Sequence, residues 1–150
     1  MLIKTAVACV ALLLLASSSW AELEPWDDYD ISESVWSVTT VKVKSNLGNA
    51  YLEGLKKTWI PGNKISQELG QIEEWAIYRS ELPASGDFNL MLVVKFAKTE
   101  DLAPNKAEYK KFMAKFTKKM NDETTEYSQK NYPGMREITG EYWMREITIK

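Results

Sequence analysis

The sequence predicts a two-layer α+β domain in which one antiparallel sheet carries two helices on a single face. Three observations predict it. Four segments are rich in β-branched and aromatic residues, two stretches between them repeat apolar residues every three or four positions, and their order is β-α-β-β-α-β. We expect this domain over residues 35–150, after an acidic segment over residues 22–34 and a signal peptide over residues 1–21.

The N-terminus has the three parts of a cleavable signal peptide. Lys4 supplies a positive charge, Ala6 to Ala16 is an apolar stretch without charge, and Ser19 and Ala21 are the small residues expected before a cleavage site. The apolar stretch is shorter than the roughly 20 residues of a membrane-spanning helix. We therefore expect export, to a periplasm first of all and otherwise by secretion, with no membrane span after the signal is removed.

The segment over residues 22–34 carries six acidic residues and no basic residue. Such a composition is typical of an extended or disordered lead-in. The first strand is expected at Val35 to Lys44 (VWSVTTVKVK), where β-branched residues dominate. A helix should follow, capped by Asn46 or Asn49, with Leu52, Leu55 and Trp59 on one face.

Pro61 and Gly62 are expected to break or kink this first helix, which would continue to Leu69 and stop at Gly70. The second strand is predicted at residues 72–80 (IEEWAIYRS), because its apolar and polar side chains alternate. A hairpin loop at residues 81–87 then leads to the third strand at residues 88–96 (FNLMLVVKF).

The second predicted helix shows the clearest periodicity in the chain, with Tyr109, Phe112, Met113, Phe116 and Met120 on one face. The pattern fades near Gln129, and the triplet Tyr-Pro-Gly at 132–134 predicts a turn. The last strand is expected from Met135 to Lys150. The tetrapeptide Arg-Glu-Ile-Thr occurs in it twice, at 136–139 and 145–148, which we interpret as coincidence within one long or bulged strand.

This order of elements is that of a ferredoxin-like fold. A sheet with both helices on one face needs cover on the other, and a two-fold dimer that stacks sheet on sheet is the common solution. The chain resembles the dimeric α/β-barrel superfamily in its short βαββαβ chain, its kinked first helix (YLEGLKKTWIPGNKISQELG) and the aromatic strand that follows (EEWAIYRS). The resemblance covers residues 35–150, contains no residue-specific motif, and implies a homodimer.

Members of that superfamily include monooxygenases, haem proteins related to chlorite dismutase, polyketide cyclases and small proteins of unknown role, so the resemblance assigns no activity. After residue 21 the chain contains no cysteine and no histidine. Nucleophilic Cys–His and Ser–His–Asp machinery therefore cannot be built, and zinc, copper and haem lose their usual ligands. We expect no metal and no cofactor; a haem would need tyrosine as its axial ligand.

Loss of Lys4 with the signal leaves 18 basic residues against 21 acidic ones, a balance that argues against nucleic acid as a partner. Aromatic residues are abundant, and they line ligand cavities as well as cores. In the resembled architecture a cavity lies between the concave face of the sheet and its helices. The candidate ligand-binding residues, each of which could also be core, dimer interface or rim, are Trp36, Tyr51, Trp59, Trp75, Tyr78, Arg79, Tyr109, Tyr142 and Arg145.

Two functions remain open at this point. The first is an exported module without catalytic activity that binds a small apolar or aromatic ligand, or a protein partner. The second is a cofactor-independent oxygenase, isomerase or cyclase acting on an aromatic or polyketide-like substrate, in which a tyrosine or carboxylate would move the proton. A cavity into which arginine or tyrosine converges, beside a carboxylate of raised pKa, would favour the enzyme.

Overall fold

A computed structural model describes residues 22–82 and 85–150 of the chain. The predicted signal peptide, residues 1–21, lies outside the described residues. The elements in chain order are β1 (Tyr29–Ile31), β2 (Val35–Val43), α1 (Gly48–Lys57), α2 (Trp59–Glu68), β3 (Glu74–Arg79), β4 (Leu90–Phe96), the short 3-10 helix η1 (Thr99–Leu102), α3 (Lys106–Lys115), α4 (Lys118–Met135), β5 (Arg136–Met144) and β6 (Ile147–Ile149). In this described part, no helix combines the length and the apolar character needed to cross a membrane.

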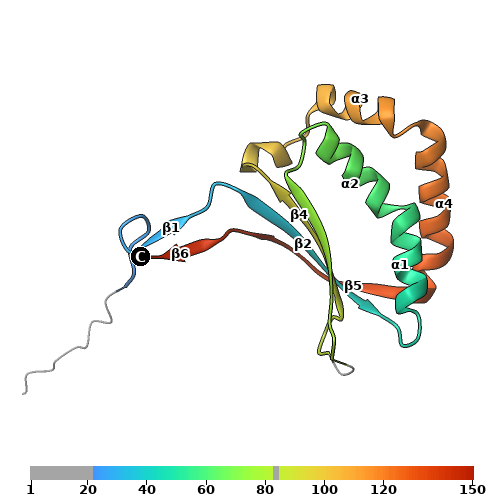
Figure 1. Cartoon of the computed structure of the whole chain (residues 1–150), viewed down its shortest axis with the longest axis horizontal. Coiled ribbons are helices and arrows are strands. Elements are labelled where there is room, and N and C mark those ends of the chain that lie inside the picture. The colour runs from blue at the N-terminus through green and yellow to red at the C-terminus, as the bar shows by residue number, and fades with distance from the viewer. Residues whose placement is uncertain (1–21, 83–84) are drawn as a thin grey trace, which may run out of the picture.

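The main sheet has four strands in the order β3-β4-β2-β5, and every neighbouring pair in it is antiparallel. Helices α1 to α4 all lie on one side of this sheet (Figure 1). From β2 to β5 the chain therefore follows the βαββαβ order with two central strands from opposite halves. This confirms the predicted α+β ferredoxin-like fold.

Strand alternation divides the sheet into a face covered by helices and an open face. Val41 and Val43 of β2 point to the helices together with Leu90 and Leu92 of β4. They form one buried cluster with Tyr51, Leu55 and Tyr132, and the partly buried side chains around it are Leu47, Leu52, Trp59, Ile77, Tyr127 and Met135. The core thus lies between the sheet and the helices.

The first predicted helix is two helices, with the break at Thr58 rather than at Pro61-Gly62. A proline ring clashes with the carbonyl four residues earlier, here that of Lys57, and this clash favours a break in the helix before Pro61. Pro61 is instead the third residue of α2, where a missing N–H leaves no helical hydrogen bond unmade. Thr58 closes α1 by donating its Oγ1 hydrogen to the Gly54 carbonyl at 3.0 Å.

The second predicted helix is also divided, and it is longer than its pattern suggested. Helix α3 begins after Asn105, whose side chain accepts hydrogen bonds from the N–H groups of residues 107 and 108. It ends at Lys115, just before the buried Phe116, and Thr117 caps α4 by accepting from the Met120 N–H at 3.3 Å. The turn predicted at residues 132–134 is wrong, because α4 includes Pro133 and runs to Met135.

The last predicted strand is also two strands. β5 stays in the main sheet, with a bulge where its pairing shifts between Thr40 and Val41, and β6 leaves the sheet to pair with β1. Together β1 and β6 form a ribbon that projects from the side opposite the helices (Figure 1). The acidic lead-in therefore contains a strand, which its charge did not indicate. Lys150 contributes to this pairing through an ion pair with Asp30 at 2.9 Å.

Candidate functional site

The structure distributes the predicted ligand-binding residues over several places. Tyr51 and Trp59 lie in one groove between the helices and the sheet, and Trp75 packs edge-on against Trp59 with ring centroids 5.6 Å apart. Arg79 lies at the end of the sheet, and Tyr109 is exposed on α3. The open face carries the remaining candidates, Trp36, Tyr78, Tyr142 and Arg145.

Arg145 has structural partners at the point where the ribbon leaves the sheet. Its Nη1 atom donates hydrogen bonds to the carbonyl oxygens of Ser32 at 2.8 Å and Glu33 at 2.7 Å, and its Nη2 atom contacts the Thr99 hydroxyl. These contacts join the start of β2, the 3-10 helix and the end of β5. Arg145 therefore fixes the ribbon.

A groove between α1, α2, α3 and α4, which we call the Arg136 groove, brings together the most informative chemistry. Its larger lobe has a volume of about 360 Å³, and its floor includes Leu92 of the sheet. A smaller lobe of about 280 Å³ shares Ser128, Tyr132 and Arg136 with it. The other residues that line the two lobes are Tyr51, Leu55, Thr58, Trp59, Gly62, Asn63, Ser66, Phe112, Thr124, Gln129 and Pro133.

Tyr51 and Tyr132 line this groove, and Tyr127 packs against Tyr132 from outside it. The rings of Tyr51 and Tyr132 meet edge-on at 5.2 Å between centroids, and Tyr127 meets Tyr132 at 5.9 Å. The Tyr132 and Thr58 hydroxyl oxygens lie 2.5 Å apart in a buried hydrogen bond. Gly54 makes this packing possible, because a Cβ atom there would stand only 3.0 Å from both the Tyr127 and the Tyr132 rings.

Arg136 is the first residue of β5 and pairs with Val43, whose side chain faces the helices. Its guanidinium carbon lies 5.1 Å from the centroid of the Tyr132 ring and 5.9 Å from that of Tyr51. The Nε atom is buried and has no hydrogen-bond partner in the described part of the chain. Two aromatic rings thus surround a cation that keeps an unused donor.

The ion pairs among residues 22–82 and 85–150 do not include Arg136. Burial raises the pKa of Tyr51, and the nearby positive charge of Arg136 offsets only part of that effect. Burial also raises the pKa of Tyr132, against the opposing effect of its hydrogen bond to Thr58. Both tyrosines are therefore protonated near neutral pH, and the groove carries one full positive charge.

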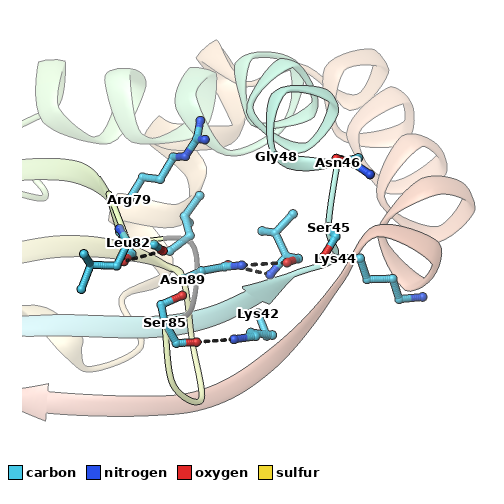
Figure 2. A pocket seen from close by; sticks show the side chains of 12 residues that line it. Lys42, Lys44, Ser45, Asn46, Gly48, Arg79, Leu82, Ser85 and Asn89 are labelled. Carbon is cyan, nitrogen blue, oxygen red and sulfur yellow. Dashed lines mark hydrogen bonds between the residues drawn. The ribbon is translucent and has the colours of Figure 1, made fainter.

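A second pocket, of about 600 Å³, lies where β2 and β3 end (Figure 2). Its basic residues do not converge. The Lys42 ammonium donates to the carbonyl oxygens of Ser85 and Gly86, both at 2.5 Å, and Lys44 extends away from Arg79 in Figure 2. The Asn89 side chain accepts a hydrogen bond from the Val43 N–H and donates one to the Val43 carbonyl, at 2.8 Å each. This pocket is built mainly from contacts that close the end of the sheet.

The centre of the open face of the sheet is apolar and has no helix over it within the described chain, while Lys95 lies over the Trp36 ring nearby. Val38 and Val93 lie at its centre and are shielded only by their neighbours. Tyr78, Tyr142 and Met144 are each more than half exposed around them. Several of these side chains, with Trp36, line a depression of about 310 Å³.

Sequence reasoning missed Arg136, Tyr132 and Thr58. The sequence Tyr-Pro-Gly at 132–134 is typical of a turn, so the second helix was predicted to end before Tyr132. In the structure Arg136 pairs with Val43 and Ile138 pairs with Val41, so both side chains lie on the helix side. Alternation from residue 136 predicts that Arg136 and Ile138 share one face. The helix boundary was the missing information.

Searches of protein-family models and of curated proteins gave no match to this chain. Solved structures with a similar fold include a NIPSNAP-like domain protein from Burkholderia xenovorans, which is 13% identical with a TM-score of 0.44 over 79% of this chain and 85% of that one. Protein SO0527 from Shewanella oneidensis is 15% identical, with a TM-score of 0.44 over 81% and 99%.

A dimeric protein of unknown function and ferredoxin-like fold from Bacteroides fragilis is 10% identical to this chain, with a TM-score of 0.40 over 81% of this chain and all of that one (100%). At such identities the likeness concerns the fold alone. The chemistry of the site therefore depends on this chain's own residues.

Proposed function

We propose that this chain is an exported, homodimeric domain that binds a small apolar or aromatic ligand in the Arg136 groove. The observation that carries the proposal is the buried, unpartnered Nε atom of Arg136 in a groove walled by Tyr51 and Tyr132. Ligand sites are typically concave and largely apolar, with a few polar groups that fix orientation. Leu92, Phe112 and Trp59 supply the apolar surface here.

The dimer is proposed on the open sheet face, with a second copy of this chain as its occupant. Monomeric proteins rarely leave a continuous apolar surface of this kind exposed. Val38, Val93 and the exposed rings of Tyr78 and Tyr142 would become the centre of a two-fold interface. Export rests on the signal-peptide pattern of residues 1–21.

The alternative, a cofactor-independent enzyme, needs a group that accepts a proton near neutral pH. Tyr51 and Tyr132 have raised pKa values, so they donate hydrogen bonds and do not act as bases. The one carboxyl group among the described residues with a clear shift is Glu108, whose pKa is lowered by its hydrogen bonds to Lys111 and Gln71. These directions favour binding over acid–base chemistry.

The test uses N-phenyl-1-naphthylamine, a neutral fluorescent probe, and a variant that fills the groove. Gly62 lines the larger lobe, and a Cβ there would stand 3.8 Å from the Phe112 ring, so Gly62→Leu adds its side chain to the groove. Gly134→Leu is the matched control, because no atom lies within 4 Å of its Cβ position. We expect saturable probe binding that Gly62→Leu abolishes and Gly134→Leu preserves. Equal binding by both variants would reject the groove as the site.

A further inference from the structure

The positive charge of Arg136 is left uncompensated by the fold. Its Nε atom is buried without a partner, and none of the ion pairs in the described chain includes it. Arg136 is half-buried, and a buried N–H donor without a partner costs free energy of folding. The rings of Tyr51 and Tyr132 reduce that cost by cation–π attraction, but within the described chain the Nε donor stays unpaired.

The guanidinium group holds its donors in one plane, in a fork that matches the two oxygens of a carboxylate. Arg136 lines both lobes of the groove, so a ligand that enters either lobe reaches it. Ser128 lines both lobes with it, and the Ser128 hydroxyl can donate to a second oxygen. The Thr58 hydroxyl already donates to the Gly54 carbonyl, and Tyr132 donates to Thr58. A carboxylate therefore matches both the planar guanidinium donors of Arg136 and the hydroxyl donor beside them.

The charge of the groove also limits the ligand. Arg136 is the only charged residue among those that line the two lobes. One cation matches one negative charge, whereas a phosphate dianion would keep a charge unpaired in an apolar site. The rest of the lining, with Leu92, Trp59 and Phe112, suits a hydrocarbon or aromatic body.

We propose that Arg136 binds the carboxylate of a small aromatic or aliphatic acid whose apolar body lies in the groove over Leu92, Trp59 and Phe112. The proposal rests on the proposed function, since it names the class of ligand for the same groove. It adds that a negative charge on the ligand is required for tight binding. A neutral ligand of the same shape should enter the groove and bind weakly.

The experiment compares 2-naphthoate with its neutral isostere 2-naphthamide by isothermal titration calorimetry at pH 7. We expect the wild-type protein to bind the acid at least about tenfold more tightly than the amide. Arg136→Gln should reduce the affinity for the acid to that for the amide, and Arg136→Lys should restore part of the preference. Arg79→Gln is the matched control, because it removes a positive charge from the pocket in Figure 2, away from the groove.

The possible failures are distinct. Equal affinity of the wild-type protein for acid and amide would overturn the carboxylate proposal and leave the groove as a ligand site. Binding of neither compound, together with no binding of the neutral probe, would reject the proposed function as well. An equal loss in Arg136→Gln and Arg79→Gln would show a general charge effect and overturn the role of Arg136. The wild-type comparison decides the question even if Arg136→Gln fails to fold.

Discussion

On the helix side of the sheet, Val41 and Leu90 are no more than 3% exposed, while on the open side Tyr78, Tyr142 and Met144 are more than 50% exposed. Both sides carry apolar side chains from the same strands. On the helix side α1 and α4 pack together over the sheet, and the Arg136 groove lies between the helices. The open side ends on aromatic and methionine side chains with nothing over them. One sheet thus has a face covered by helices of its own chain and a face on which we propose that a second copy packs.

A substitution in the core on the helix side should give the largest loss of stability. Leu55 is 1% exposed and belongs to the main buried cluster, so Leu55→Ala should lower the free energy of unfolding by about 3 kcal/mol. Met144→Ala on the open face should lower it by less than about 1 kcal/mol at concentrations where the protein is monomeric. Urea denaturation of the two variants measures this difference. Equal losses would contradict the assignment of the core to the helix side.

A smaller loss is expected where α1 approaches α4. The 3.0 Å contacts of a Cβ at Gly54 with Tyr127 and Tyr132 mean that Gly54→Ala should destabilise the protein by about 1 kcal/mol, despite the better helix propensity of alanine. Gly62→Ala has ordinary contact distances and should stabilise α2 by roughly 0.5 kcal/mol. Thermal unfolding measures whether each variant has a lower or a higher melting temperature than the wild-type protein. Stabilisation by Gly54→Ala would show that the tyrosines move aside freely.

The open face is tested by oligomeric state. Tyr142→Lys places a charge in the proposed interface twice in each dimer, and should raise the dimer dissociation constant by at least about tenfold. Tyr109→Lys is the matched control, because Tyr109 is exposed on α3, on the helix side. Sedimentation velocity over a concentration series measures both. A wild-type protein that stays monomeric at tens of micromolar would reject the dimer.

The smallest effect is expected at alkaline pH. The pKa values of Tyr51 and Tyr132 are raised in the folded protein above the ordinary value of 10.0, mainly by burial. The unfolded chain therefore loses these protons at a lower pH than the folded protein. The contribution of the two tyrosines to the free energy of unfolding is fully present below pH 10 and falls as the pH rises above it. Tyr51→Phe removes one of these groups, so its stability should fall less steeply above pH 10. Parallel curves for variant and wild type would contradict the role of Tyr51.

The sequence predicted the strands well because alternation in β2 and β4 is produced by the two faces just described. It predicted the helix breaks less well. Helix α3 ends beside the buried Phe116, and α4 continues through a proline that is tolerated two residues before its last residue. Neither burial nor that tolerance can be deduced from the local pattern. The ribbon pairs residues more than 100 positions apart, which local composition does not encode.

The same limit explains the candidate site. Tyr51 and Trp59 were predicted, since large aromatic side chains identify themselves in a sequence. Arg136 was not, because its importance depends on missing partners, and a missing partner is a property of the folded molecule. Arg79 and Arg145 have the same residue type, but Arg145 is used by backbone carbonyls and Arg79 lies outside the groove.

The indole N–H signals of a ¹H–¹⁵N NMR spectrum test the account of the two faces most directly. Trp59 lies in the Arg136 groove with Trp75 packed on it, and Trp36 lies on the open face. We predict that 2-naphthoate shifts the signals of Trp59 and Trp75 and leaves Trp36 in place, whereas dilution from dimer to monomer shifts Trp36 and leaves Trp59. A ligand that shifts Trp36 alone, or dilution that shifts Trp59 alone, would contradict the account.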